Sequence, residues 1–221
     1  MCRFLMAKSL SPIPPGRLLR DFADMAERSR APDGDRQADG WGAAWLDESG
    51  GWRIRISTDP IWDDRPALDL IPASPILLVH ARSASFPGHK GVAAYNQPFA
   101  SESWAFVFNG LLQGVSLPRP VAGEIGAQKI WALLSERLAV EPPETALAEV
   151  TALLDRHSRR LQGLNIGVCD KKNLYAFCRF EGDGSYYQLY AHRSPGLSLV
   201  CSEPLPDLEF QPLPRDAVLT I

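Results

Sequence analysis

The second residue of the chain, Cys2, combines two groups that could do chemistry together. If Met1 is removed, Cys2 carries a thiol nucleophile and a free α-amine on one residue. An α-amine titrates near pH ~8 and a thiol near pH ~8.5, so the amine could take the thiol proton around neutrality, directly or through one water. Small second residues such as cysteine allow methionine removal. Any protein can have cysteine at position 2, so the case depends on the rest of the chain.

Polar residues also follow two segments that are expected to be buried strands. The first strand, residues 76–79, leads into His80-Ala81-Arg82-Ser83-Ala84-Ser85, and the second, residues 104–108, ends in Asn109-Gly110. Hydrolysis of a side-chain amide needs a nucleophile, a proton shuttle, donors for the developing oxyanion and groups that hold the substrate. Two strand ends therefore present residue types that such a reaction uses.

Hydrophobic periodicity predicts the elements that must position these residues. We expect a strand that begins over 3–6 and is stopped by the proline-rich stretch 12–15 before Gly16, and then a helix over 17–27. The later elements are a hairpin of 43–46 and 52–56, helices over 126–138 and 145–161, and a closing β meander with strands at 165–168, 174–177, 186–190 and 197–200. Strands, then a helical pair, then more strands imply stacked sheets flanked by helices.

Six segments, taken together and in order, resemble one family, although each alone is weak. They are Cys2, Asp39-Gly40-Trp41-Gly42, His80-Ala81-Arg82-Ser83-Ala84-Ser85, Asn96-Gln97-Pro98-Phe99, Phe108-Asn109-Gly110 and Cys201-Ser202-Glu203-Pro204-Leu205. The set resembles a class II glutamine amidotransferase domain, which belongs to the N-terminal nucleophile (Ntn) hydrolases. The chain is most similar to stand-alone members such as the γ-glutamyl hydrolases of ergothioneine synthesis and glutathione breakdown.

The resemblance covers nearly the whole chain and implies its architecture. It implies one domain over residues 1–221 with an α/β (α+β) fold, a four-layer α/β/β/α sandwich of two mainly antiparallel sheets. It also implies the catalytic residues. Cys2 would form a γ-glutamyl thioester, and Asn109 and Gly110 would donate hydrogen bonds to the tetrahedral oxygen. Outside this set of motifs, an Asn-Gly pair after a strand is more often an ordinary turn.

Further residues receive substrate-binding or positioning roles from the resemblance. Arg82 corresponds to the arginine that grips the substrate α-carboxylate, and Ser85 to a nearby hydroxyl. Arg36 and Asp39 resemble the pair that orients the chain's N-terminus. A surface salt bridge for Arg82 and an ordinary charged turn for Arg36 and Asp39 are the competing interpretations. The same set implies that Asn96 and Gln97 line the site, whereas we interpret His80 as a core histidine and Glu203 as structural.

Two positions depart from the family pattern. Relatives usually carry an aspartate before a helix that pairs with the substrate α-ammonium, and Gly126 stands at that position here. A charged hydrogen bond of this kind is worth ~1.5 to 3 kcal/mol, or one to two powers of ten in binding. Either Glu124 supplies the carboxylate from the preceding turn, or the substrate lacks a free ammonium there. Phe108 replaces the histidine that many relatives have before Asn-Gly, which affects packing more than chemistry.

Composition and charge exclude several other classes of protein. The 221 residues are 45% hydrophobic with a net charge of -3, and basic residues form no run longer than a pair, which argues against a nucleic-acid surface. No window approaches the ~18 to 20 apolar residues of a membrane span, and no signal-peptide pattern precedes the first prolines, so we expect a cytoplasmic protein that does not bind membranes.

The remaining histidines, cysteines and glycines predict neither a metal site nor a cofactor. The four cysteines contain no CxxC pair and are too few for a disulfide framework, and His89, His157 and His192 share no metal-ligand spacing. Glycines form no nucleotide-binding pattern.

The resulting hypothesis is an amide hydrolase that cleaves glutamine or a γ-glutamyl amide through a Cys2 thioester and releases ammonia or an amine. Its partner is then a small-molecule amide. Two alternatives stay open: an amidase or acylase of the same fold whose substrate lacks an α-ammonium, and a catalytically silent domain that binds a separate synthase subunit.

Overall fold

A seven-stranded sheet contains the first strand, β1 (Arg3–Ile13), near its middle. The computed structural model describes residues 1–31, 33–182 and 186–221. In this sheet the strand order is β11-β9-β10-β1-β4-β2-β3. The other members are β2 (Trp41–Leu46), β3 (Trp52–Ser57), β4 (Ser74–Ala81), β9 (Tyr190–Ser194), β10 (Leu197–Cys201) and β11 (Gln211–Pro212). The neighbours of β1 are therefore one strand from the first half of the chain and one from its last quarter.

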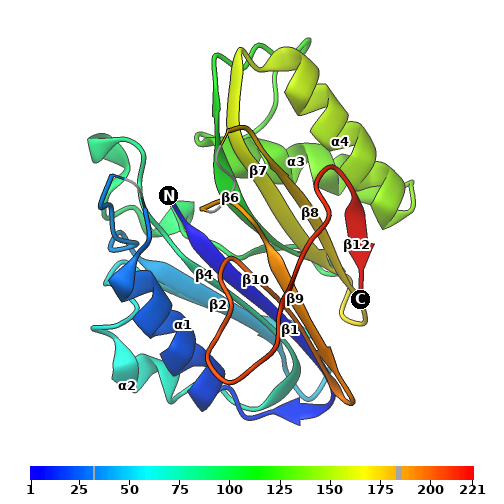
Figure 1. Ribbon diagram of the computed structural model, residues 1–221. Coiled ribbons are helices and arrows are strands. Elements are labelled where there is room, and N and C mark those ends of the chain that lie inside the picture. The colour runs from blue at the N-terminus through cyan, green and yellow to red at the C-terminus, as the bar shows by residue number, and fades with distance from the viewer. Residues whose placement is uncertain (32, 183–185) are drawn as a thin grey trace.

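A second sheet of five strands stacks on the first (Figure 1). Its order is β12-β8-β7-β6-β5, and the strands are β5 (Phe99–Ala100), β6 (Ala105–Gln113), β7 (Arg160–Cys169), β8 (Leu174–Phe180) and β12 (Val218–Thr220). All pairings in both sheets are antiparallel.

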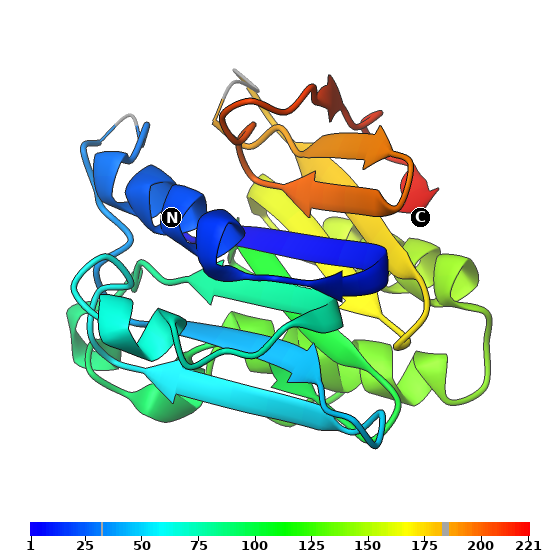
Figure 2. The same cartoon turned by 90° about the horizontal axis from the view of Figure 1, so that it is seen from below.

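Helices cover the outer face of each sheet. Figure 2 shows α1 (Gly16–Arg28) and α2 (Arg65–Leu68) over the seven-stranded sheet, with α3 (Gly126–Leu138) and α4 (Pro143–His157) on the opposite side of the molecule, over the five-stranded sheet. Two 3-10 turns, Pro87–His89 and Ala93–Tyr95, lie in the loop that joins the two sheets. The expected four-layer α/β/β/α sandwich is confirmed.

The side chains of β1 show how the layers are held together. Phe4 and Met6 pack in the core between the sheets, whereas Leu5 and Ala7 pack against α1. Successive side chains of a strand point to opposite faces, so a strand buried on both faces reads as a continuous apolar run. A third core lies between the five-stranded sheet and the α3–α4 pair.

β1 ends at Ile13, inside the proline-rich stretch that was expected to stop it, after a shift in its register with β4. Other strand and helix predictions need correction. β6 does not end at Asn109 but runs on to Gln113. The helix expected to reach residue 161 ends at His157, and Leu161 lies in β7.

The closing β meander was also wrong. β7 and β8 pair in the five-stranded sheet, but β9 and β10 join the other sheet, and of the segment 186–190 only Tyr190 is in a strand; residues 183–185 lie outside the described residues. A two-residue period predicts a strand but not the sheet that it joins. Within the described ranges, no helix is long and apolar enough to cross a membrane.

Candidate active site

Cys2 lies immediately before β1 and beside the end of β4. Arg3 is the register partner of Ala81, which brings Cys2 next to Ser83. The Cys2 sulfur lies 3.5 Å from the backbone nitrogen of Ser83 and 3.6 Å from its carbonyl oxygen. Burial raises the pKa of the Cys2 thiol, while the positive charge of the Met1 amine and the N–H of Ser83 act in the opposite direction. The thiol is thus held by backbone groups at the junction of two strands.

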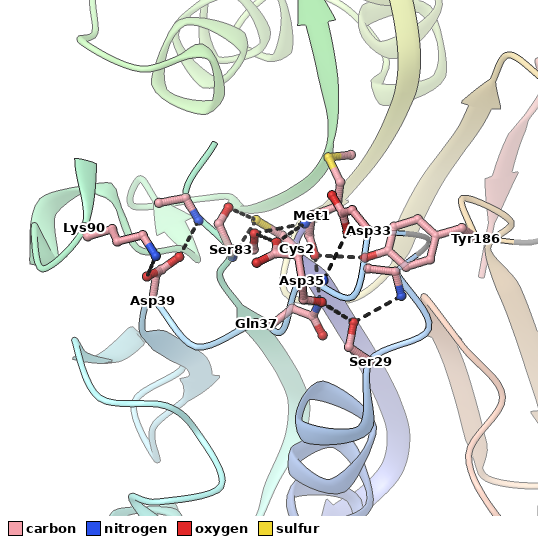
Figure 3. Close-up of polar contacts among 12 residues, drawn as sticks. Met1, Cys2, Ser29, Asp33, Asp35, Gln37, Asp39, Ser83, Lys90 and Tyr186 are labelled. Carbon is pink, nitrogen blue, oxygen red and sulfur yellow. Dashed lines mark hydrogen bonds and ion pairs between the residues drawn. The ribbon is translucent and has the colours of Figure 1, made fainter. Parts of the chain in front are cut away.

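Met1 is bound at both of its backbone ends (Figure 3). Its ammonium group donates to Oδ2 of Asp35 and to Oγ of Ser83, each at 2.9 Å. Its carbonyl oxygen accepts from Nε2 of Gln37 at 2.9 Å and from the hydroxyl of Tyr186 at 3.2 Å. Burial opposes ionisation of Asp35, but hydrogen bonds with Ser83 and the Met1 ammonium lower its pKa overall.

The contacts of Arg36 and Asp39 differ from those expected. Arg36 faces away from the N-terminus, where it pairs with Glu27 at 3.2 Å and lies over the Trp62 ring at 4.7 Å. The contacts with Met1 are made by its neighbours Asp35 and Gln37, so a role of Arg36 in orienting the N-terminus stays a prediction. Asp39 accepts from the N–H of Ala84 at 2.7 Å and pairs with Lys90 at 3.2 Å, so it fixes the segment that carries Ser83 without touching Met1.

Arg82 is almost fully buried where β4 ends, 5% exposed. Its Nη1 donates to the carbonyl of His89 at 2.9 Å and to Oδ1 of Asn96 at 3.4 Å. The guanidinium also lies 5.6 Å from the centre of the Tyr95 ring. Tyr95 in turn donates to Oε2 of Glu124 at 2.7 Å, so one aromatic side chain links Arg82 to Glu124. Ser85 lies three residues beyond Arg82 and is exposed.

His80 and Gln97 fix the backbone just before Asn109. Nε2 of His80 lies 3.2 Å from the carbonyl oxygen of Phe108, and Oε1 of Gln97 accepts from the Phe108 N–H at 2.6 Å. Burial lowers the pKa of His80 to about 3, so the ring is neutral and its Nε2 carries the proton donated to Phe108. His80 is a buried core histidine, as expected, and acts on the strand that carries Asn109.

Asn109 and Gly110 occupy the middle of β6. Asn109 is 1% exposed, and within the described part of the chain neither its side-chain nitrogen nor its oxygen has a hydrogen-bond partner. Leaving a buried amide without hydrogen bonds costs free energy. A ligand that bonds to the Asn109 side chain would offset this cost. A Cβ on Gly110 would lie 2.1 Å from the carbonyl oxygen of Gly163 on β7. Only glycine, which has no Cβ, avoids this steric clash.

The last family segment supports the start of β1. Oγ of Ser202 accepts from the N–H of Phe4 at 3.0 Å, and Glu203 pairs with the buried Arg3 at 2.7 Å. The structural role expected of Glu203 therefore fits its contacts. Arg3 also donates to the carbonyl oxygen of Tyr186 and lies 3.8 Å from the centre of its ring.

Sequence reasoning missed four residues that contact Met1: Asp35, Gln37, Ser83 and Tyr186. Asp35, Gln37 and Ser83 stand next to residues that were singled out. Tyr186 had no comparable signal, because its contact spans 185 positions of sequence. No group of three potential metal ligands lies together among the residues that the structure describes.

Comparison with known proteins decides the family. No family model matches the chain. It is 32% identical over 167 residues to the γ-glutamyl-hercynylcysteine sulfoxide hydrolase of Mycolicibacterium smegmatis, covering 74% of this chain and 69% of that protein. The chain belongs to the class II glutamine amidotransferase family. As a member of this family it is an enzyme that hydrolyses amides.

Solved structures agree with the fold of this class II amidotransferase. A glutamine aminotransferase class-II domain protein from Silicibacter pomeroyi superposes over the whole chain and 94% of its own, with a TM-score of 0.66 at 20% identity. The glutamine phosphoribosylpyrophosphate amidotransferase of B. subtilis gives a TM-score of 0.70 at 10% identity, and the chain spans about half of it, 49%. At these identities the likeness concerns the Ntn-hydrolase fold alone.

Proposed function

We propose that residues 1–221 form one domain that hydrolyses glutamine or a γ-glutamyl amide through a thioester on Cys2. The observation that carries the proposal is the Asn109 side chain, which is buried on β6 and has no hydrogen-bond partner among the described residues. β6 packs against β1 and β4, the two strands whose ends carry Cys2 and Ser83. The Asn109 amide N–H is available to an oxyanion without first breaking a hydrogen bond within the described chain. Preorganised donors of this kind stabilise the developing charge of acyl transfer.

The reaction begins once Met1 has been removed. The freed α-amine of Cys2 takes the thiol proton, and the sulfur attacks the amide carbon of the substrate. The carbonyl oxygen becomes an oxyanion that accepts from the Asn109 side chain and the Gly110 backbone N–H. The Cys2 ammonium then protonates the amide nitrogen, the C–N bond breaks, and ammonia or an amine leaves. Water hydrolyses the thioester and restores the thiol.

Arg82 and Ser85 hold the glutamyl part of the substrate. Arg82 is kept in place by His89 and Asn96, and its planar fork suits a carboxylate. The γ-glutamyl group in the name of the curated relative supports this assignment. Asp39 contributes by fixing the segment between Ser83 and Ser85 through the N–H of Ala84.

Two alternatives for the substrate α-ammonium have different structural support. Glu124 is tied to Tyr95, which lies against Arg82, and this chain of contacts favours a carboxylate supplied from the turn before α3. A Cβ at Gly126 would meet no atom within 4 Å, so a substrate without an ammonium finds open space there. A substrate without an α-ammonium corresponds to the alternative function, an amidase or acylase of the same fold.

Intact-mass spectrometry with a glutamine-analogue diazoketone tests the proposal. We expect loss of Met1 and one adduct on Cys2, and no adduct in the Cys2→Ala variant. Burial raises the pKa of Cys169, Cys178 and Cys201 to about 12, 11 and 12, which leaves these thiols protonated and inert. A processed Cys2 that reacts with general thiol reagents but not with the diazoketone would contradict a glutamine-shaped site, and full activity in Cys2→Ala would contradict the thioester.

A further inference from the structure

A row of three side chains crosses the five-stranded sheet at the level of Asn109. Asn109 on β6 is the register partner of Asn165 on β7, and Asn165 is the register partner of Cys178 on β8. Figure 1 shows these three strands side by side. Register partners project from the same face of a sheet, and here that face is the one between the two sheets, because Cys178 belongs to the core there. Asn165 therefore stands between Asn109 and Cys178.

The Asn165 amide has one bonded end and one free end. The side chain is fully buried, and its Nδ2 donates to the carbonyl oxygen of Tyr187 at 2.6 Å. A carbonyl only accepts, so this contact fixes which end of the amide is the nitrogen. Among the residues that the structure describes, Oδ1 of Asn165 has no hydrogen-bond partner. A buried oxygen without a donor costs free energy, and an N–H group within reach would offset that cost.

The bonded end of the Asn165 amide turns toward β8. The Tyr187 carbonyl lies on that side, because the Cys178 sulfur is 3.8 Å from the same oxygen. The oxygen of the planar Asn165 amide is therefore left for the β6 side, where both polar atoms of the Asn109 side chain also lack a partner within the described ranges. Opposed side chains on neighbouring strands have Cβ atoms about 4.5 to 5.5 Å apart, which lets two asparagines bond to each other.

We propose that Asn165 is a positioning residue for the oxyanion donor Asn109. In the reacting complex, Oδ1 of Asn165 accepts one N–H of the Asn109 amide, and this turns the other N–H toward the oxyanion. A side-chain amide has two N–H donors, so Asn109 serves both acceptors at once. The inference rests on the proposed thioester chemistry at Cys2 and adds a residue that touches neither the substrate nor the thiol. A donor that is already oriented needs no reorganisation as charge develops, so its orientation affects the rate.

The anchor of Asn165 belongs to a segment that is fixed to β1. Tyr187 follows Tyr186, and the rings of these two residues lie edge to face with their centres 5.2 Å apart. The buried Arg3 donates to the carbonyl oxygen of Tyr186 at 2.9 Å and lies over its ring. Arg3 directly follows Cys2 in the chain. Asn165 is thus held by a segment that is itself attached beside the nucleophile.

A double-mutant cycle on turnover tests whether Asn165 acts through Asn109. With γ-glutamyl-p-nitroanilide, Asn165→Ala should lower kcat about tenfold and leave KM within about twofold, because it removes one hydrogen bond of the reacting complex. In the Asn109→Ala background the same substitution should change kcat by less than about twofold, because the side chain that it orients is absent. Diazoketone labelling of Cys2 counts the active sites, so that each kcat refers to folded and processed protein.

Cys178→Ala is the matched control for the attachment of the Tyr187 segment. It removes the other side chain that contacts the Tyr187 carbonyl, but Cys178 lies one strand further from Asn109. We expect a lower unfolding free energy and a kcat within about twofold of the wild type. An equal loss of kcat in Cys178→Ala, or a further tenfold loss from Asn165→Ala when Asn109 is already alanine, would overturn the positioning role and indicate a general loosening of the segment.

A crystal structure of the diazoketone adduct checks the contact without any substitution at Asn165. We expect Nδ2 of Asn109 within about 3.2 Å of both Oδ1 of Asn165 and the carbonyl oxygen of the adduct. If Cys2 forms the adduct but the two amides stay apart or are bridged by water, this inference alone is overturned. Failure of Cys2 to form the adduct would overturn the thioester chemistry and this inference with it.

Discussion

Asn109 on β6 and Asn165 on β7 are register partners across the five-stranded sheet, yet their side-chain amides differ in bonding. Nδ2 of Asn165 donates to the carbonyl oxygen of Tyr187 at 2.6 Å. In the chain as described, Nδ2 of Asn109 has no acceptor. Of these two paired asparagines, Asn165 thus has a structural hydrogen bond, whereas the amide of Asn109 is free to bind a ligand.

This difference predicts opposite effects of two alanine substitutions. Asn109→Ala should lower kcat by about 10² to 10³ while leaving the unfolding free energy nearly unchanged, because an oxyanion donor is lost but no hydrogen bond within the described protein. Asn165→Ala should lower the unfolding free energy by about 1 to 3 kcal/mol, because it leaves the buried Tyr187 carbonyl with only the weak thiol donor of Cys178. Steady-state kinetics and urea unfolding measure both. A strongly destabilised Asn109→Ala with normal kcat would show that Asn109 is structural.

Glycine-to-alanine substitutions at positions 110 and 126 should also differ. The added Cβ at Gly110 would lie 2.1 Å from the Gly163 oxygen, so β6 and β7 must separate. We expect a loss of about 1 to 3 kcal/mol in unfolding free energy. At Gly126, on the first turn of α3, the Cβ meets nothing within 4 Å, and alanine should be neutral or stabilise by up to about 1 kcal/mol. Urea denaturation of both variants checks this, and equal stabilities would contradict it.

Placing an aspartate at position 126 should improve the use of free glutamine. The carboxylate would stand where relatives carry their ammonium ligand, in space that is open here, and at a helix N-terminus that favours negative charge. We expect Gly126→Asp to raise kcat/KM for glutamine by about 10- to 100-fold. Gly126→Asn is the uncharged control. If both variants gain equally, or neither gains, the ammonium is not recognised from this position.

The buried His80 should make stability depend on pH. Its pKa is about 3 in the folded chain against 6.5 when unfolded, so below pH 6.5 the unfolded state binds a proton that the folded state does not. Stability therefore falls as the pH drops through 6.5, and this residue alone lowers the unfolding free energy by about 1.4 kcal/mol at pH 5.5 relative to neutral pH or above.

Urea denaturation of the wild type and His80→Gln at pH 5.5 and 7.5 isolates this contribution. Other titrating groups act alike in both proteins. The change in unfolding free energy between pH 5.5 and 7.5 should therefore be smaller by about 1.4 kcal/mol in the variant. The same difference in both proteins would mean that His80 titrates normally in the folded state.

The stacked sheets flanked by helices were predictable because hydrophobic residues repeat with different periods in strands and in helices. The order of the two kinds of element then implied the layers. The helix over 126–138 has the predicted bounds, and the apolar run 76–79 lies in β4. The partner of each strand was not predictable. β9 and β10 were expected to continue from β8, but β10 pairs with β1 and β9 pairs with β10 in the other sheet. Pairing depends on the whole chain, and no local pattern carries that information.

The structure brings the predicted segments together, while the roles of their side chains stay predictions. Arg82 is buried at the end of β4, and Asn109 and Gly110 lie in the middle of β6. The resemblance gave Arg36 and Asp39 the role of orienting the N-terminus, whereas Asp35 and Gln37 contact Met1, because only the geometry shows which side chains of a loop face inward.

The position of β1 between β4 and β10 has a consequence for the timing of synthesis. Leu5 pairs with Cys201, so the first strand lacks one of its two neighbours until more than 200 residues have been made, which takes about 10 to 40 s at typical rates. In the folded chain the Met1 side chain is 13% exposed and its ammonium is bound on two sides. The proposed function requires removal of Met1, so we expect a peptidase to act during this delay, and a chain that folds first should retain Met1 on Cys2.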